Sequence, residues 1–281
     1  MTQIDFHLQL NHNDNWSMSR LHFHDYCEFL LPLTSPGNIF VNDQVYPLRR
    51  GTLYLIGENT LHRTIATGFH ARYVLHISRK ALSALSTPQT DFSRMAQSAF
   101  LRADMSNDQM ISLIERFQAL ERNKNDGAFG SDVHQAIALL DLLLQVAPIL
   151  DAATAGDAVR SKDFLRVSPI LDYIRDHLSE PLTLDLIAGQ FYLSKHYLCR
   201  IFKSATGFSV MEYIIYSRVL KARQLLKEGV SVQQAGELSG FSDNSHFIRT
   251  FGHLTGTSPG RYAREHQGSD AAPILGGSLK E

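Results

Sequence analysis

The sequence has little of what marks secreted, disulfide-bonded or membrane-spanning proteins. Its 281 residues include two cysteines, Cys27 and Cys199, too few for a disulfide framework or a thiolate metal site. No apolar run reaches 18 residues, and no basic segment followed by an apolar one lies near the N-terminus. We therefore expect no membrane span and no secretion signal, and a cytoplasmic protein that is nucleoid-associated when it is bound to DNA.

An excess of charge of one sign is also missing. The formal net charge of the chain is −1. Residues 166–266 hold 12 Lys and Arg against 9 Asp and Glu, a net charge of +3, which leaves −4 for the rest. A basic C-terminal part suits a DNA-binding domain, because phosphate contacts supply much of the affinity for DNA. The asymmetry is too small to decide the question.

The last third of the chain contains one unit twice, 49 residues apart. Each copy begins with a short apolar-periodic helix, residues 184–191 and 232–239, followed by a turn and a second helix. The second helices, here called the reader helices, are expected from Ser194 and from Ser242 or Asp243, the latter ending near Thr255. The residues in register are the pairs Arg200/Arg249, Phe202/Phe251, Thr206/Thr255, Gly207/Gly256, Ser209/Ser258 and Tyr213/Tyr262.

This spacing predicts two helix-turn-helix motifs joined by a helical spacer over residues 209–226. Apolar residues at helical spacing mark the core side of each reader helix, so the polar residues between them face outward. Two such helices on a rigid spacer could enter successive major grooves on one side of a duplex, about 34 Å apart. Periodicity alone leaves an ordinary helical bundle open as the alternative.

The detailed residues favour DNA binding. The segments "LSKHYLCRIFKSATGFSVMEYI", "RVLKARQLL" and "GFSDNSHFIRTFGHLTGTSPGRY" closely resemble the DNA-binding domain of the AraC/XylS family of bacterial transcription regulators, over about a hundred residues. The resemblance places three groups of DNA-contacting candidates on the reader helices. On the first reader helix, base contacts are expected from His196, Cys199 and Arg200, and phosphate contacts from Lys195 and Lys203. On the second reader helix, DNA contacts are expected from Asn244, Ser245, His246 and Arg249.

Two points weaken the assignment of the second copy. The alternative for Arg249 is a surface ion pair with Glu237 or Asp243. Where the family usually has Ile-Ala in the first helix, this chain has Ala235-Gly236. Glycine inside a helix costs about 1 kcal/mol relative to alanine. We therefore expect the second reader helix to be held less firmly.

The N-terminal part, to about Ala81, predicts short strands separated by turns. They are expected over residues 20–33, 38–41, 44–48, 52–56, 62–67 and 72–77, a spacing typical of a barrel or jelly roll. Side chains alternate along a strand, so His22, His24, Tyr26 and Glu28 share one face, and His62 begins a later strand.

The segments "RLHFHDYCEF" and "YPLRRGTLYLIGENTLH" resemble a cupin barrel, the sensor domain found in many AraC-type regulators. The resemblance implies an effector pocket built from His22, His24, Tyr26, Glu28 and His62. The histidines and Glu28 also match the ligand set of metal-binding cupins, so a divalent ion is chemically possible. We nevertheless predict no cofactor and no bound metal, since such sensors often hold an organic ligand alone and Gly57-Glu58-Asn59 replaces the usual Pro-x-Gly.

Two apolar helices are expected between barrel and linker, over residues 108–122 and 131–150. The second is apolar on more than one face. Core packing is one explanation. Dimerisation is the other, because sensors of this family dimerise through helices in this position.

The predicted protein is an α+β chain of two domains. A cupin-like ligand-sensing and dimerisation domain spans residues 1–150, with a jelly-roll barrel at about 15–81, helices at about 108–150 and an N-terminal arm over residues 1–16. This domain is followed by a linker at 151–164 and by an all-α DNA-binding domain with two helix-turn-helix motifs at 165–266. A flexible tail is expected at 267–281.

The predicted function is sequence-specific transcription regulation without enzymatic activity. The expected partners are promoter DNA, a small-molecule effector, a second copy of the chain and, if the protein is an activator, RNA polymerase, but no membrane. The "HFHDYCEFL" segment resembles sensors associated with carbohydrate use, so a sugar is the leading effector class and an aromatic or other small metabolite the alternative. The other function class left open is a metal-dependent cupin enzyme holding its ion with His22, His24, Glu28 and His62.

Overall fold

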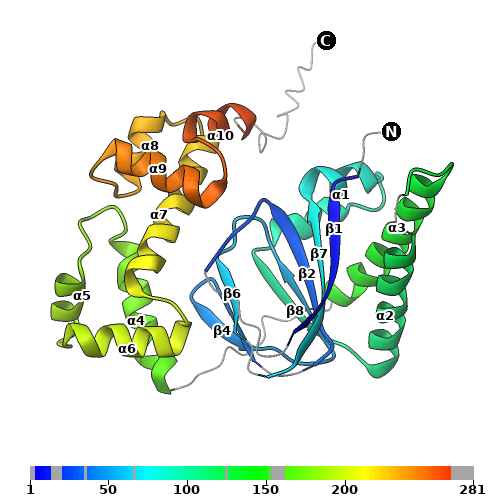
Figure 1. The fold of residues 1–281 in the computed structure, drawn as a ribbon, viewed down its shortest axis with the longest axis horizontal. Coiled ribbons are helices and arrows are strands. Elements are labelled where there is room, and N and C mark those ends of the chain that lie inside the picture. The colour runs from blue at the N-terminus through cyan, green and yellow to red at the C-terminus, as the bar shows by residue number, and fades with distance from the viewer. Residues whose placement is uncertain are drawn as a thin grey trace, which may run out of the picture. The chain divides into compact units, whose positions relative to one another are not determined.

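The computed structural model describes residues 4–13, 21–34, 37–65, 68–123, 126–151, 153 and 162–266. The chain divides into two compact units, residues 1–168 with 200–208 and residues 169–199 with 209–281. The first is rich in strands and the second is helical (Figure 1), as expected for an α+β chain. Residues 152 and 154–161 of the predicted linker and the predicted tail, 267–281, lie outside the described residues. The domain boundaries remain predictions.

Two antiparallel sheets build the first unit. The five-stranded sheet has the order β1-β7-β2-β5-β8 and the three-stranded sheet the order β4-β3-β6. An isolated bridge between His22 and His62 joins the segment before β2 to the start of β6. The strands are β1 (Phe6–Asn13), β2 (Tyr26–Pro32), β3 (Asn38–Val41), β4 (Gln44–Pro47), β5 (Thr52–Ile56), β6 (His62–Ile65), β7 (His70–Ser78) and β8 (Phe100–Asp104).

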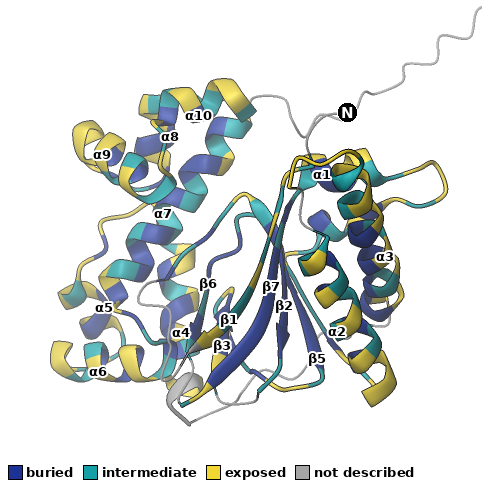
Figure 2. Cartoon of the chain, turned by 45° about the vertical axis from the view of Figure 1, so that its right-hand side comes forward, coloured by how far each residue is buried: buried dark blue, intermediate teal, exposed yellow. Residues whose placement is uncertain are grey.

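Alternation along the strands sends side chains into two separate apolar clusters. Leu30 of β2, Tyr54 of β5 and Val74 of β7 pack with Ile39 and Val41 of β3. Their neighbours in sequence, such as Phe29, Leu55 and Leu75, belong to a second and larger cluster. Both faces of the central strands are therefore buried, as the dark blue of β2, β5 and β7 shows in Figure 2.

Helices cover the face of the five-stranded sheet that carries the larger cluster. Ser106 caps α2 (Asn107–Arg122) through a capping box with Gln109. Leu113 and Phe117 of this helix pack in the larger cluster with Leu139 and Leu142 of α3 (Ser131–Asp151). Both predicted helices of this region are confirmed. Two short elements, α1 (Arg79–Leu85) and η1 (Phe92–Gln97), complete the unit.

Helix α3 is long and apolar enough, by length and composition alone, to span a membrane. Seven of its residues are buried in the unit, including Leu139, Leu143 and Val146. This packing is typical of a core helix in a folded domain, so its apolar character is weak evidence for a membrane.

The structure changes the predicted sheet in three places. Residues 6–13 of the expected N-terminal arm form β1, because Phe6, Leu8 and Leu10 alternate with polar residues and pack against the larger cluster. Strand β8 comes from beyond the predicted barrel, and β2 begins at Tyr26 rather than at residue 20. Among the described strands, no pairing closes the two sheets into one barrel.

The helical part follows the predicted duplication. It contains α4 (Lys162–Asp176), α5 (Leu184–Gln190), α6 (Lys195–Thr206), α7 (Val210–Lys227), α8 (Val232–Leu238), α9 (Asn244–Thr255) and α10 (Pro259–His266). Ser209 caps the spacer helix α7 through a capping box with Glu212. Helix α7 packs against α8, α9 and α10.

Candidate functional site

The second helix-turn-helix is a compact unit of α8, a turn and α9. Ser231 caps α8, and the Asp243 carboxylate caps α9 by accepting a hydrogen bond from the His246 backbone N–H at 2.6 Å. Helix α9 ends at Gly256, whose φ of 74° lies in the left-handed region. The predicted bounds, residues 232–239 and a second helix from Ser242 or Asp243 to about Thr255, agree with these helices to within one or two residues.

The two turns differ by one residue. The first helices of the copies, α5 and α8, begin 48 residues apart, whereas the reader helices α6 and α9 begin 49 residues apart. Each turn contains one left-handed residue, Gly240 with a φ of 96° in the second copy and Tyr192 with a φ of 55° in the first. The Tyr192 side chain is 97% exposed. A bulky residue is rarely found in this conformation, so the first turn has a strained position that the second avoids.

The reader helices present the predicted polar residues to solvent. On α6, Leu198, Ile201 and Phe202 are buried, whereas the predicted residues Lys195, His196, Arg200 and Lys203 are exposed and Cys199 is half-buried. On α9, Phe247 and Phe251 are buried and the predicted Asn244, Ser245, His246 and Arg249 are exposed. The outward faces are therefore polar, as helical periodicity indicated.

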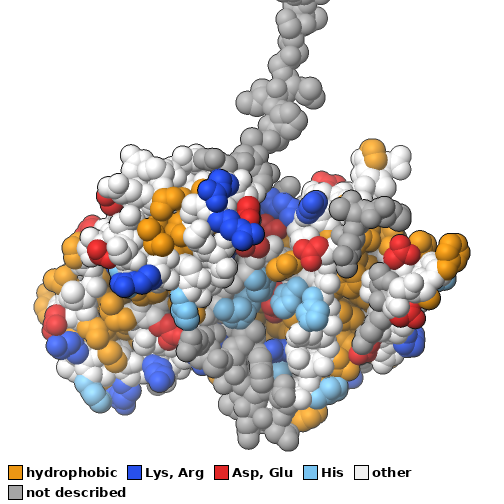
Figure 3. Space-filling model, turned by 45° about the horizontal axis from the view of Figure 1, so that its top comes forward, with side chains coloured by type: hydrophobic (Ala, Val, Ile, Leu, Met, Phe, Trp, Pro, Cys, Tyr) orange, Lys and Arg blue, Asp and Glu red, His pale blue; other side chains and the backbone are white. Residues whose placement is uncertain are grey.

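Ion pairs distinguish two of the predicted DNA contacts. Lys195 Nζ lies 2.9 Å from Asp185 Oδ1, which ties the start of α6 to α5. Arg249 makes no ion pair with any described residue. Glu237 accepts a hydrogen bond from Gln233, and Asp243 caps α9. The surface-pair alternative for Arg249 is therefore not seen among the described residues. On the face drawn in Figure 3, basic and acidic side chains are interspersed, in keeping with the small net charge.

Gly236 has a packing role that the sequence did not reveal. A Cβ at this position would lie 2.8 Å from Cδ1 of Phe247, whose ring fills the space beside α8. Ala235 and Phe247 are both fully buried. The glycine permits close packing of α8 against α9, so the expected looseness of the second reader helix finds no support in the packing of this motif.

A second group of polar side chains gathers in the strand-rich unit. One ligand atom from each of His22, His24, Glu28 and His62 lies within 4.8 Å of the others. The sequence predicted all four. They come from the segment before β2, from β2 and from the start of β6, and the paired backbones of His22 and His62 hold two of these segments together.

His76 joins this cluster and was missed by the sequence analysis. It lies on β7 directly opposite Glu28 on β2, and its Nε2 is 2.9 Å from Glu28 Oε2. The signal was available, since residue 76 belongs to the predicted strand 72–77, but the pairing of β7 with β2 was not. We call these five residues, His22, His24, Glu28, His62 and His76, the histidine cluster.

Tyr26, the remaining predicted pocket residue, lies at the edge of the cluster. Its ring centroid is 6.4 Å from that of His76. Burial, together with the carboxylates of Asp5 and Asp25, raises the pKa of the Tyr26 phenol. The phenol therefore lies beside these acidic residues, and its backbone carbonyl, not its side chain, contacts His24.

Backbone contacts fix the orientation of two imidazoles. His24 Nδ1 donates to the carbonyl of Tyr26 and His62 Nδ1 donates to the carbonyl of Thr60, each at 2.9 Å. Asn59 precedes Thr60 with a φ of 58°, and its N–H donates to the carbonyl of His24. Asparagine tolerates this left-handed conformation better than most residues. The altered Gly57-Glu58-Asn59 motif therefore still forms a turn that positions His62.

The surroundings of Glu28 favour its ionised form. Burial alone would raise the pKa of this carboxyl, but contacts with His24, His62 and His76 hold it well below its usual value. Burial, and next the neighbouring His62, lower the pKa of His22 to about 3, so this imidazole is neutral at pH 7. The cluster thus combines a carboxylate with at least one neutral imidazole.

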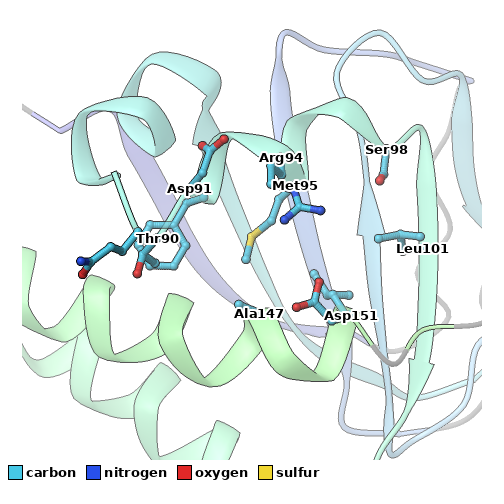
Figure 4. Close-up of a pocket in the computed structure, with 11 residues that line it drawn as sticks. Thr90, Asp91, Arg94, Met95, Ser98, Leu101, Ala147 and Asp151 are labelled. Carbon is cyan, nitrogen blue, oxygen red and sulfur yellow. The ribbon is translucent and has the colours of Figure 1, made fainter. Parts of the chain in front are cut away.

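A different hollow of about 420 Å³ lies between η1, β8 and the end of α3. Figure 4 shows Arg94 and Met95 extending toward Ala147 and Asp151 across it, whereas the Asp91 carboxylate points away from them. Its lining includes acidic, basic and apolar side chains. No arrangement of these groups indicates a particular ligand.

Comparison with known proteins supports the helix-turn-helix assignment. Residues 187–265 match the family described as a helix-turn-helix domain, a span that covers both reader helices. Together with the geometry of α8 and α9, this match makes the chain a DNA-binding transcription regulator.

Two curated relatives extend the similarity over most of the chain. The uncharacterized HTH-type transcriptional regulator YfiF of Bacillus subtilis is 27% identical over 86% of this chain and 78% of its own length. The HTH-type transcriptional activator RhaS of Salmonella arizonae is 26% identical over 90% of this chain and 89% of its own. The family match and these relatives agree with the resemblance of the sequence to AraC-type transcription regulators.

A solved structure is similar at lower identity. Unsaturated fatty acid bound wild-type ToxT from Vibrio cholerae shares 15% of its sequence over 97% of this chain and 100% of that chain, with a TM-score of 0.38.

Proposed function

We propose that this protein regulates transcription by binding a specific DNA sequence through α6 and α9, under the control of a small-molecule effector. The observation that carries the proposal is the duplicated unit, with an exposed arginine at the same position of each reader helix, Arg200 and Arg249. A guanidinium can donate two parallel hydrogen bonds to guanine O6 and N7, which gives sequence discrimination.

The experiment is selection of a binding sequence from a random duplex library, followed by titration of the selected and of a scrambled duplex. We expect the selected site to bind at least 10³-fold more tightly than the scrambled one at physiological salt. Affinity for both should fall steeply as salt rises. Equal affinity for the two duplexes would contradict the proposal.

We further propose that the strand-rich unit is a cupin-type sensor whose pocket includes His22, His24, Tyr26, Glu28 and His62. A carbohydrate is the effector class favoured by the sequence resemblance. Buried polar groups need partners, and an unsatisfied one costs about 1–3 kcal/mol. His62 Nε2 is buried, and its contact with Glu28 Oε2 at 3.5 Å does not meet hydrogen-bond geometry, which supports a ligand at this place.

The sensor proposal is tested by screening sugars and small aromatic metabolites for stabilisation of the protein against heat. A true effector should change DNA affinity, and His24→Ala should abolish that change while basal DNA affinity stays within a few-fold. His134→Ala, on an exposed turn of α3, is the matched control. An effector response that survives His24→Ala would place the pocket elsewhere.

We also propose that the protein is a homodimer through α3. Val133, Ile137, Leu140 and Leu144 follow each other at spacings of four, three and four residues, which places them on one side of the helix. Ile137 is 57% and Leu144 56% exposed, whereas Leu140 is half-buried. An exposed apolar stripe of this kind is typical of a helix that packs against a partner.

Two further assignments belong to the same proposal. A cytoplasmic location follows from a role on promoter DNA. If the protein activates transcription, RNA polymerase is a partner; the relative RhaS is described as an activator. No observation favours the metal-dependent enzyme, and we propose that the protein is not an enzyme.

A further inference from the structure

The segment that enters the first helix-turn-helix motif touches the turn of the second. This segment, residues 177–180, follows α4 and precedes Thr183, the residue that caps α5. A Cβ at Gly240, in the turn between α8 and α9, would collide with the carbonyl oxygen of Leu178. Only a residue without a side chain allows the two backbones to come this close. All of these residues belong to the second compact unit.

Arg218 of α7 contacts both backbones. Its Nε donates a hydrogen bond to the carbonyl of Leu178 at 3.1 Å, and its Nη2 donates to the carbonyl of Glu180 at 2.7 Å. Nε and Cζ of the same guanidinium lie 2.8 and 3.1 Å from the position that a Cβ of Gly240 would take. One planar group therefore fills the corner between α7, the segment before α5 and the turn before α9.

This corner joins two groups of helices that otherwise meet along α7. Helices α8, α9 and α10 pack against α7 and against one another, and among the described elements no contact of this extent joins them to α4 or α5. In Figure 1, α5 lies near one end of α7 and α8 near the other. Two groups that share a single helix can pivot about it, whereas a second point of attachment fixes the angle between them.

The angle between the two motifs has a direct meaning on DNA. Two reader helices on one chain enter successive major grooves on one side of the duplex. Each added base pair turns the second DNA element about the duplex axis by roughly 35° and moves it along that axis. A protein with a fixed angle between its motifs therefore accepts one spacing of the two elements.

We propose that Arg218 is a positioning residue that sets the spacing at which the protein accepts its two DNA elements. It acts by fixing the turn before α9 relative to the segment before α5. Its two donors form a rigid fork that a lysine ammonium on a flexible stem does not reproduce. This inference rests on the proposed DNA-binding function and adds a spacing requirement to it.

Lys221, three residues further along α7, offers a matched control. Its Nζ donates one hydrogen bond to Ser179 Oγ at 2.7 Å, and Ser179 is exposed. Lys221→Ala removes the same positive charge from the same helix as Arg218→Ala does. It leaves the fork between the Leu178 and Glu180 carbonyls in place.

The test uses the full-length protein and the duplex selected for specific binding. The base pairs at which Arg200→Ala and Arg249→Ala relax the preference mark the two elements of each chain, and one or five base pairs are inserted between them. For the unmodified protein, one inserted base pair should weaken binding by about 10-fold or more, as a mismatched base pair does. Five inserted base pairs, about half a helical turn, should remove the contribution of one element altogether.

The variants should differ on the duplex with one inserted base pair. Arg218→Ala should lose only about 2-fold on it, because a pivoting motif follows a rotation of roughly 35°, and should keep the full loss on five. Its affinity for duplexes with either element scrambled should equal that of the unmodified protein. Lys221→Ala should keep the full loss on one. Circular dichroism checks the folding of each variant, and Arg218→Lys replaces Arg218→Ala if the latter fails to fold.

Two outcomes would overturn the proposal. One is a loss on one inserted base pair that is as large for the Arg218 variant as for the unmodified protein. The other is a Lys221→Ala protein that tolerates the insertion as well as the Arg218 variant does, which would mean a general softening of α7. Discrimination between the selected and scrambled duplexes by the unmodified protein tests the proposed DNA-binding function separately. If that discrimination is present and the inserted base pair costs nothing, only the spacing inference fails.

Discussion

Arg200 and Lys203 lie on the same exposed side of α6 but carry different hydrogen-bonding groups. The planar guanidinium of arginine can read a guanine edge with two parallel bonds, whereas the lysine ammonium acts as a point charge. Arg200→Ala should therefore weaken binding to the selected duplex by about 1–3 kcal/mol and relax the preference at one base pair. Lys203→Ala should weaken all sequences alike and lower the salt slope by about one.

Fluorescence anisotropy on the selected and scrambled duplexes measures both effects. Arg200→Lys is the informative control, because it keeps the positive charge while losing the two-bond geometry. It should retain the salt slope and lose discrimination. Equal losses on both duplexes for Arg200→Ala and Lys203→Ala would show that α6 does not read bases.

A second residue-scale prediction concerns His70 on β7. Burial, and next the positive charge of Arg72, lower the pKa of this imidazole to about 4. In the unfolded chain the pKa of this imidazole is near 6.5. Between pH 6.5 and pH 4, His70 is therefore protonated in the unfolded chain and neutral in the folded chain. Stability should therefore fall as pH drops from about 6.5 to about 4.

Replacing His70 by Gln should remove part of this pH dependence, on the order of 1–3 kcal/mol at pH 4, since one pKa unit corresponds to about 1.4 kcal/mol. Urea unfolding at pH 7.5 and at pH 4.5 measures it. His253→Gln, at an exposed position of α9, is the control. An unchanged pH dependence in His70→Gln would contradict the assigned shift.

Individual residues were predictable where a local pattern carried the information. The sequence grouped His22, His24 and Glu28 correctly, although both histidines precede β2 and the Tyr26 phenol lies beside Asp5 and Asp25. Helical periodicity placed Arg200 and Arg249 outward. The place of His76 beside Glu28 was not predictable, because it depends on the pairing of two strands whose paired residues lie 48 positions apart. Periodicity within one strand does not specify its neighbour.

At the scale of elements, helices were predicted more accurately than strands. Capping residues mark helix ends in the sequence, as Ser209, Ser231 and Asp243 do. Strand β1 shows the opposite case. Its alternation is clear in "FHLQLNHN", but such an N-terminal segment can be a free arm or an edge strand. Only its pairing with β7, which the sequence does not show, makes it a strand.

The close packing of α8 on α9 gives a prediction for two glycines. At Gly236 a Cβ would collide with the Phe247 ring, whereas at Gly189 of α5 it would meet nothing within 4 Å. Gly189→Ala should stabilise the protein by up to about 1 kcal/mol through helix propensity. Gly236→Ala should destabilise it, because an overpacking cost of about 1–3 kcal/mol outweighs the same gain.

Thermal unfolding of the two variants beside the unmodified protein measures the contrast. Each variant serves as the control for the other, since both make the same substitution inside a short helix. A Gly236→Ala protein as stable as Gly189→Ala would mean that Phe247 moves aside freely. The second helix-turn-helix would then be as loose as its sequence suggested.

At the scale of the whole molecule, the sequence identified the kinds of domain better than the arrangement of the sheets. The duplicated unit repeats enough residues to specify a helix-turn-helix domain. The strand-rich unit draws β1 and β8 from outside the predicted barrel range, since sheet order depends on contacts far apart in sequence.

The proposed dimer through α3 affects DNA binding by the helix-turn-helix motifs. Leu144→Glu places a charge in the apolar stripe of α3, where a partner helix would have to bury it. We expect the unmodified protein to have twice the mass of one 31.6 kDa chain by light scattering, and Leu144→Glu to have the mass of one. His134→Glu adds the same charge to the same helix outside the stripe, so it should remain a dimer.

DNA binding should report the same change. A dimer brings four reader helices to the duplex and a monomer two, so Leu144→Glu should contact about half as many phosphates. The slope of log affinity against log salt is proportional to the number of phosphates neutralised. We therefore expect that slope to fall by about half in Leu144→Glu and to stay unchanged in His134→Glu. If the unmodified protein has the mass of one chain, α3 is a core helix with an exposed apolar side, and one chain with two reader helices is the complete DNA-binding unit.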